Sequence, residues 1–154
     1  MADAERKPVK ILLVEDNPGD LGLMEEAFAQ SDVQVHLTSA QDGEVAMEIL
    51  LQRGRYLDAS LPDLILLDLN LPKKDGREVL AEIKAHESLR RIPVVVLTSS
   101  AAESDILAAY DLNANCYITK PMRLQELLDV VKYIEVFWLT IVKLPPSPVH
   151  VEKG

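Results

Sequence analysis

The chain has 154 residues, a length that suits one domain, and its hydrophobic fraction of 48% can build a core and argues against intrinsic disorder. Asp and Glu total 25 against 16 Lys and Arg, and the net charge of −9 argues against nucleic-acid binding and against a polybasic membrane-surface protein. Cys116 is the single cysteine, so no intrachain disulfide is possible. No apolar stretch approaches the roughly 20 residues that span a bilayer, and the charged N-terminus lacks a signal core, so we expect a cytoplasmic protein.

Short apolar runs alternate with longer amphipathic stretches along the chain. The short runs predict five strands, at residues 11–14, 33–38, 64–67, 93–97 and 116–118. The longer stretches predict helices beginning near residues 17, 42, 76 and 100, and a long last helix from about 123 to about 142. We therefore expect an α/β fold, a flavodoxin-like (βα)5 three-layer sandwich whose parallel five-stranded sheet has the order 2-1-3-4-5.

Local signals predict where two of the helices begin and where one loop lies. Asn17 and Pro18 are typical of an N-cap and a first helical position. Ser100 and Glu103 have the spacing of a capping box, which predicts a helix start at Ser100. Residues 54–62 contain no regular pattern, so we expect a loop there.

Three carboxylates follow two predicted strands. Glu15 and Asp16 end the first strand and Asp68 ends the third, and these strands are neighbours in the expected order. Three carboxylates in one small pocket repel one another, and a hard divalent cation removes that conflict. Mg²⁺ suits such a site because it takes few protein oxygens and keeps waters and phosphate oxygens in its octahedron. The sequence therefore predicts a metal site that would hold a phosphoryl group against Asp68.

Two further polar side chains follow the fourth and fifth predicted strands. Thr98 can donate its hydroxyl to a phosphoryl oxygen, and Lys120 can balance the phosphoryl charge. Taken singly, such residues are more often caps, turn residues or surface residues. Their position at four strand ends on one edge of the sheet favours the functional interpretation.

These motifs resemble the receiver domain of two-component response regulators, over about residues 8–135. The motifs are Val14-Glu15-Asp16-Asn17, Leu66-Leu67-Asp68-Leu69-Asn70-Leu71-Pro72 with Gly76, Leu97-Thr98-Ser99 and Lys120-Pro121. The resemblance implies that Asp68 accepts a phosphoryl group from a phosphohistidine of a sensor kinase. It implies direct Mg²⁺ ligation by Asp16 and Asp68. It further implies ligation by Glu15 through water and by Asn70 through its backbone carbonyl.

The same resemblance assigns a catalytic set and a conformational switch. Asp68, Thr98 and Lys120 form the catalytic set, and the bond from Lys120 to Pro121 is expected to be cis. On phosphorylation, Thr98 would move toward the phosphoryl group and Tyr117 would turn inward behind it. Without the resemblance, Tyr117 is better explained as an ordinary core aromatic. The implied protein is a signalling domain and not an enzyme, assisting only its own phosphorylation and dephosphorylation.

A narrower resemblance links the chain to the stand-alone cyanobacterial phytochrome response regulators. It lies in residues 63–78 and in Phe137-Trp138-Leu139 followed by Leu144-Pro145-Pro146. It implies a phytochrome as the kinase partner and no DNA-binding output. We expect an N-terminal arm at 1–8, a receiver domain at 9–135, and a helix extension with a Pro-rich tail at 136–154. The output partner would then be another protein or a second copy of this chain.

The later half of the last predicted helix is apolar around nearly its whole circumference. Such a patch is typical of an interface, with aromatic residues as anchors. We therefore expect a homodimer whose interface includes Tyr133, Ile134, Phe137, Trp138 and Ile141. The alternative is that the extension folds back over its own domain and buries Trp138.

Three rival functions use related features. Phosphatases of the haloacid-dehalogenase type also combine an aspartate nucleophile with Mg²⁺, but they place a general-acid aspartate where this chain has Asn70, and their acidic pair comes late in the chain. A dinucleotide-binding module needs a Gly-rich turn after the first strand, where this chain has Glu15 and Asp16. A receiver that only scaffolds is disfavoured because the residue set is complete.

Overall fold

The structure is a computed structural model, and it describes residues 8–31, 33–120 and 124–137. Five parallel strands form one sheet in the order β2-β1-β3-β4-β5, as predicted. The strands are β1 (Val9–Val14), β2 (Val35–Ala40), β3 (Leu64–Leu67), β4 (Val94–Thr98) and β5 (Cys116–Thr119). This arrangement confirms the flavodoxin-like α/β fold.

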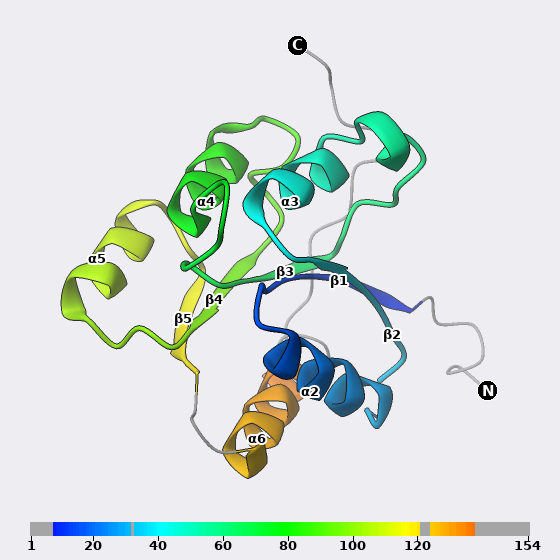
Figure 1. Ribbon diagram of the computed structural model, residues 1–154, viewed down its shortest axis with the longest axis vertical. Coiled ribbons are helices and arrows are strands. Elements are labelled where there is room, and N and C mark those ends of the chain that lie inside the picture. Colours follow the sequence, from blue (N-terminus) through cyan, green and yellow to red (C-terminus); the bar gives the residue numbers. More distant parts are fainter. Residues whose placement is uncertain (1–7, 32, 121–123, 138–154) are drawn as a thin grey trace.

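Helices cover both faces of the sheet (Figure 1). One face carries α3 (Gly43–Leu50), α4 (Gly76–Ala85) and α5 (Glu103–Asp111), and the other carries α2 (Pro18–Ala29) and α6 (Leu124–Ile134). Because both faces are covered, β3 and β4 are buried along their whole length, which explains their uninterrupted apolar sequences. Among the described residues, no helix combines the length and apolarity needed to cross a membrane.

Successive residues of each central strand point into two different cores, as the two-residue period of a strand requires. Leu12, Ile65 and Val96 face α3 and α4, whereas Leu13, Leu66 and Val95 face α2 and α6. The six side chains are at most 2% exposed. The strands are thereby packed on both faces, and this packing positions the residues that follow their carboxyl ends.

The carboxyl ends of the strands meet at one edge of the sheet. The register pairs Val14 with Leu67 and Thr98 with Thr119. The ladder continues one step further, because the Asp68 N–H donates to the Val14 carbonyl at 3.0 Å and the Lys120 N–H donates to the Thr98 carbonyl at 2.6 Å. The functional residues predicted from the sequence therefore stand at or directly after the ends of these strands, where the hydrogen bonds of the sheet position them.

Gly76 lets α4 begin very close to the loop after β3. A Cβ at this position would lie 2.2 Å from the Asp68 carbonyl oxygen and 2.6 Å from the Leu69 Cα. No side chain larger than hydrogen fits there without moving the backbone. The glycine thus belongs to the framework that positions Asp68.

Three local predictions were wrong in detail. The helix expected to start at Ser100 starts at Glu103 with Ala102 as its N-cap, and no capping box forms, because the Ser100 hydroxyl donates to Asp105 Oδ2 at 2.5 Å. Gly54–Tyr56 forms a 3₁₀ turn, η1, where a loop without regular structure was expected. The second strand covers Val35–Ala40, two residues later in the chain than the predicted range of 33–38.

The last helix agrees with prediction over the residues that the structure describes, and differs from it in one interface residue. Residues 124–134 are α-helical and 135–137 continue as a π-helical turn. Ile134 is 1% exposed and packs in the core shared with α2, so its side chain is not available to a dimer interface. Tyr133 and Phe137 are 70% and 52% exposed. Trp138, Ile141 and the first seven residues of the predicted arm at 1–8 lie outside the described residues.

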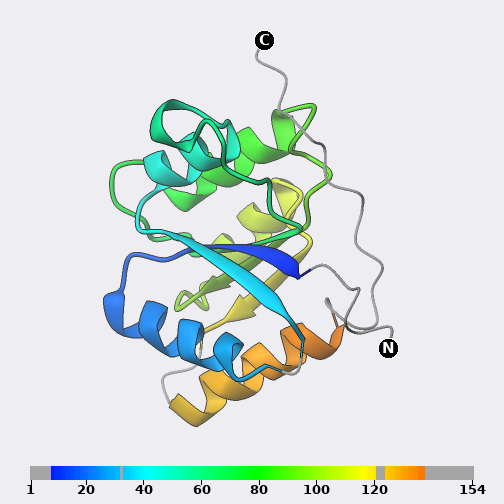
Figure 2. The same cartoon turned by 90° about the vertical axis from the view of Figure 1, so that its right-hand side faces the viewer.

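The last helix runs away from the edge where the functional residues lie. Figure 2 shows α6 beside α2, starting near the carboxyl ends of the strands and ending at the opposite edge of the sheet. Because the helix ends at that opposite edge, the exposed aromatic residues at its end are remote from Asp68.

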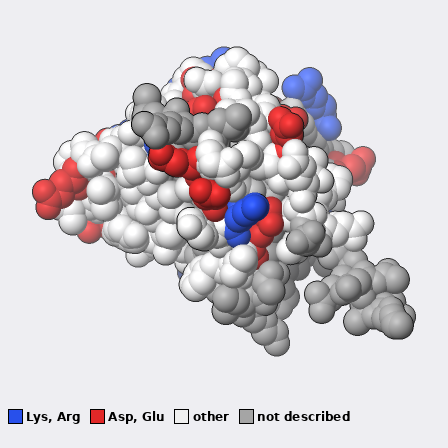
Figure 3. Space-filling view, turned by 90° about the horizontal axis from the view of Figure 1, so that it is seen from below, with Lys and Arg blue, Asp and Glu red and all other residues white. Residues whose placement is uncertain are grey.

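Acidic side chains gather in several places on the face seen in Figure 3, on the side of α2 and α6, in keeping with the net charge of −9.

Candidate functional site

Asp68 lies directly after β3 and is 5% exposed. Its Oδ1 accepts a hydrogen bond from the Thr98 hydroxyl at 2.8 Å and from the Asn70 N–H at 3.0 Å. Its Oδ2 accepts from Lys120 Nζ at 3.3 Å. Both carboxylate oxygens are thus held in place by donors from the β3 loop, β4 and the end of β5.

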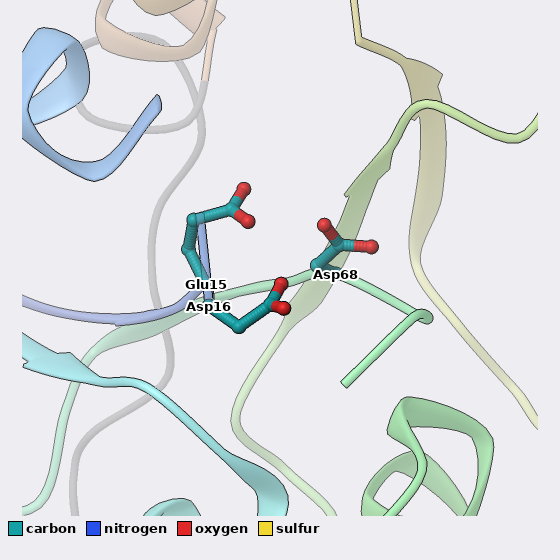
Figure 4. Close-up of side chains that lie close together, drawn as sticks. All are labelled: Glu15, Asp16 and Asp68. Atoms are coloured by element: carbon teal, nitrogen blue, oxygen red, sulfur yellow. The ribbon is translucent and has the colours of Figure 1, made fainter. Parts of the chain in front are cut away.

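Glu15 and Asp16 lie beside Asp68, at the end of the neighbouring strand β1 (Figure 4). One carboxylate oxygen from each of the three residues lies within 4.8 Å of the others. Glu15 is buried and Asp16 is exposed. Three carboxylates this close repel one another, and such a set of oxygens can hold a hard divalent cation.

Burial strongly affects the charge state of Glu15. Removal from water, reinforced by the charge of Asp68, raises the pKa of Glu15 to about 7, although the hydrogen bond from Lys120 acts in the opposite direction. The Asn17 N–H also donates to Glu15 Oε2, at 3.2 Å. A positive charge close to Glu15 would therefore stabilise its ionised form.

Lys120 supplies one such charge. The side chain is buried, and its Nζ donates to Glu15 Oε1 at 2.5 Å and to Asp20 Oδ2 at 2.8 Å, in addition to Asp68. Burial by itself would lower the pKa of Lys120, but the hydrogen bonds to Asp20 and Glu15 and the attraction of the carboxylates outweigh it and raise the pKa above its usual value. Lys120 is therefore a permanent cation within the site.

Asp20 was missed by the sequence analysis. It lies in the first turn of α2, and its backbone N–H donates to the Asn17 side chain at 3.1 Å. The N-cap signal at Asn17 was recognised, and an acidic residue three positions later, just after a pair of site acids, is the signal that would have found it. The contact with Lys120 joins residues that are 100 positions apart.

An open cleft of about 610 Å³ gives access to these side chains. Its lining residues are Glu15, Asp16, Asn17, Pro18, Asp20, Asp68, Asn70, Ser99 and Lys120. Asn70 is exposed in this cleft, on the same loop as Asp68. The predicted metal ligands thus share one solvent-accessible space with the predicted phosphoacceptor.

Thr98 and Tyr117 lie on adjacent strands next to the site. Thr98 is fully buried, and its hydroxyl contacts Asp68. Tyr117 is partly buried, and its hydroxyl donates to the Ser100 carbonyl at 2.7 Å, in the loop that follows Thr98. The structure therefore links the ring of Tyr117 to the segment that carries Thr98. Pro121 and its peptide bond with Lys120 lie outside the described residues.

A second polar network fixes the loop after β4. Arg77 donates to Asp105 Oδ1 at 2.6 Å, and the Ser100 hydroxyl donates to the other oxygen of the same carboxylate. The hydrogen bonds from Ser100 and Arg77 hold the pKa of Asp105 below its usual value. This network connects the start of α4 to α5, and the sequence analysis missed it because Arg77 and Asp105 carry no motif.

Comparison with known proteins identifies the family. The model of the response regulator receiver domain matches residues 11–132, which is most of the chain. The chain belongs to this family. Receiver domains are the signalling domains of two-component systems, which confirms the predicted resemblance.

Individual relatives cover nearly the whole chain. The response regulator Rcp1 of Synechocystis sp. is 52% identical over 147 residues, which are 96% of this chain and 100% of Rcp1. The crystal structure of the phosphorylated cyanobacterial phytochrome response regulator RcpA is 56% identical, with a TM-score of 0.88 over 91% of this chain and 100% of that one. The Mn²⁺-bound form of Rcp1 matches with a TM-score of 0.87 and 52% identity, over 90% of this chain and 100% of that one.

Proposed function

We propose that the chain accepts a phosphoryl group on Asp68 from a histidine kinase and acts as a response regulator. The observation that carries the proposal is the environment of the Asp68 carboxylate. It is held by Thr98, Asn70 and Lys120, and two further carboxylates lie within 4.8 Å of it. This arrangement provides a nucleophile, positive charge and a metal-binding group in one open cleft.

In the transfer step, an Asp68 carboxylate oxygen attacks the phosphorus of a phosphohistidine. The new O–P bond forms as the P–N bond breaks, and the departing imidazole keeps the electron pair of that bond and takes up a proton. The product is an aspartyl phosphate. Catalysis of phosphoryl transfer depends mainly on positioning and on charge stabilisation, which are what the surrounding side chains offer.

Glu15, Asp16 and Asp68, with the backbone carbonyl of Asn70, are the groups we propose to hold Mg²⁺. The bound cation supplies positive charge to the phosphoryl oxygens. The clustering of the three carboxylates supports this assignment, as does the Mn²⁺-bound form of Rcp1. The raised pKa of Glu15 adds the physical reason, because a cation in this cluster relieves the repulsion that burial makes costly.

We assign Lys120 to one phosphoryl oxygen and the Thr98 hydroxyl to another. Thr98 would then exchange its present bond with Asp68 for a bond with the phosphoryl group, and the loop after β4 would follow it. Tyr117 would turn inward as its bond to the Ser100 carbonyl is lost. The present contacts of Thr98 and Tyr117 support this switch because they join both side chains to that loop.

We propose that the kinase partner is a phytochrome and that the protein acts in the cytoplasm. The support is the similarity to Rcp1 and to RcpA, since RcpA is described as a phytochrome response regulator.

We assign residues 9–135 to the receiver and 136–154 to the extension. No observation favours the phosphatase alternative, whose general acid would have to stand at the position of Asn70.

A homodimer is the proposed assembly, with the end of α6 in the interface. Tyr133, Val136 and Phe137 are each more than half exposed, and large apolar side chains that gather on a surface are typical of an interface. Trp138 and Ile141 remain part of this proposal. Sedimentation at micromolar concentration should show a dimer for the wild type and a monomer for Phe137→Asp, and a wild type that stays monomeric with and without phosphorylation would contradict the assembly.

Acetyl phosphate with Mg²⁺ tests the phosphoacceptor. The wild type should gain an acid-stable, hydroxylamine-sensitive phosphoryl group, and Asp68→Asn should gain none. Asp63→Asn is the matched control, because it removes the acid at the other end of β3 and should leave labelling intact. Persistent labelling of Asp68→Asn would show that the acceptor is another residue.

A further inference from the structure

All three N–H donors of the Lys120 ammonium group have protein partners. They point to the carboxylates of Glu15, Asp20 and Asp68, at 2.5, 2.8 and 3.3 Å. An ammonium group has three donors and no acceptor, so this set is complete. Lys120 can therefore bind a phosphoryl oxygen well only if it gives up one of the three carboxylates.

The exposure of the three partners decides which one is released. The side chains of Glu15 and Asp68 are 2% and 6% exposed, whereas that of Asp20 is 31% exposed. A carboxylate left buried without its cation is strongly destabilising, whereas an exposed one is solvated by water. Loss of the Asp20 contact therefore costs least.

Asp20 also lies outside the metal cluster, and its negative charge is stabilised even without Lys120. The group of oxygens within 4.8 Å of one another contains Glu15, Asp16 and Asp68, and Asp20 is not among them. Asp20 lies in the first turn of α2 with its backbone N–H bonded to Asn17, and a negative charge is favoured at that end of a helix. Its carboxylate can thus remain in place after Lys120 has left it.

We infer that Asp20 is a positioning residue that holds Lys120 in the unphosphorylated protein and releases it when Asp68 carries the phosphoryl group. The inference rests on the proposed function of Asp68. Asp20 competes with the phosphoryl group for the same ammonium N–H, and its negative charge also opposes the incoming anion. Removal of this charge should therefore strengthen phosphoryl binding.

The test uses beryllofluoride as a phosphoryl analogue on the full chain, at saturating Mg²⁺. Calorimetric titration should show that Asp20→Asn binds beryllofluoride about fivefold more tightly than the wild type, the effect of a partly exposed ion pair. Asp20→Glu restores the charge and should return the affinity toward that of the wild type. Glu26→Gln removes an exposed charge from the same helix and should have no effect. A merely structural role of Asp20 would not produce this order of affinities.

Three other outcomes would each contradict either the inference about Asp20 or the proposed function of Asp68. Unchanged or weaker beryllofluoride binding by Asp20→Asn would overturn the inference, since it would show that Asp20 does not compete for Lys120. A loss of Mg²⁺ affinity in Asp20→Asn larger than its gain for beryllofluoride would also overturn it, by showing that Asp20 is a metal ligand. Failure of the wild type to bind beryllofluoride would instead contradict the proposed function of Asp68, and so the two failures are distinguishable.

Discussion

Replacement of Gly76 by alanine should damage both the fold and the site. The added Cβ would lie 2.2 Å from the Asp68 carbonyl oxygen, and ordinary contact begins at 3.4 Å, so α4 and the β3 loop must separate by about 1 Å. The clashing atoms belong to the backbone, so no side-chain rotation relieves the clash. Overpacking of this kind costs about 1–3 kcal/mol, and we expect the upper end for Gly76→Ala.

Gly22 offers a matched control within the same protein. It lies inside α2, and an added Cβ would meet nothing within 4 Å. Gly22→Ala should therefore stabilise the protein by about 0.5–1 kcal/mol, because alanine loses less conformational freedom than glycine in a helix. Urea denaturation followed by circular dichroism measures both changes.

The two glycine variants also separate stability from function. Gly76→Ala should slow the phosphorylation of Asp68 by acetyl phosphate, because the backbone of the phosphoacceptor itself must shift, and Gly22→Ala should leave the rate unchanged. If Gly76→Ala proved as stable as Gly22→Ala and equally fast, the reasoning that this glycine positions Asp68 would be refuted.

Three further predictions concern the site. Thr98→Val removes the O–H that donates to Asp68 at 2.8 Å, and urea denaturation should show a loss of about 1–2 kcal/mol; equal stability would mean that the bond contributes nothing. Mg²⁺ at about 100 times its Kd should raise the free energy of unfolding by about 2.7 kcal/mol, and Asp16→Asn should lose most of this gain in a thermal shift assay. Burial raises the pKa of Glu15 to about 7, above the 4.5 of an unfolded chain, so the folded protein holds a proton that the unfolded chain releases. Without Mg²⁺, stability should therefore fall as the pH rises from about 5 to about 8, and Glu15→Gln should flatten this dependence.

The strands were predictable from the sequence because their environment leaves a clear pattern. Leu64-Ile65-Leu66-Leu67 and Val94-Val95-Val96-Leu97 are buried on both faces, and such strands are apolar without interruption. The acids at the strand ends were predictable for a related reason, since the carboxyl ends of parallel strands meet at one edge. The family motifs then supplied the order and the roles.

The contacts that were missed depend on how distant elements are placed. Asp20 meets Lys120 because α2 begins beside the end of β5. The sequence could have marked Asp20 as an acid close to Glu15 and Asp16, but nothing in either segment pairs it with Lys120. Ser100 has capping-box spacing from Glu103, but a nearby carboxylate at Asp105 is a better partner for its hydroxyl. Ile134 lies in a stretch that is apolar on all sides, so the sequence could not show which face of that helix is buried.

The position of the phosphoryl group can be located chemically. After phosphotransfer from a phytochrome histidine kinase in the presence of Mg²⁺, borohydride reduction converts an aspartyl phosphate to homoserine, and peptide mass spectrometry finds its position. We predict homoserine at position 68 and nowhere else. Homoserine at position 16 or 20, hydroxynorvaline at position 15, or phosphate retained on a serine, threonine or histidine of this chain, would contradict this assignment.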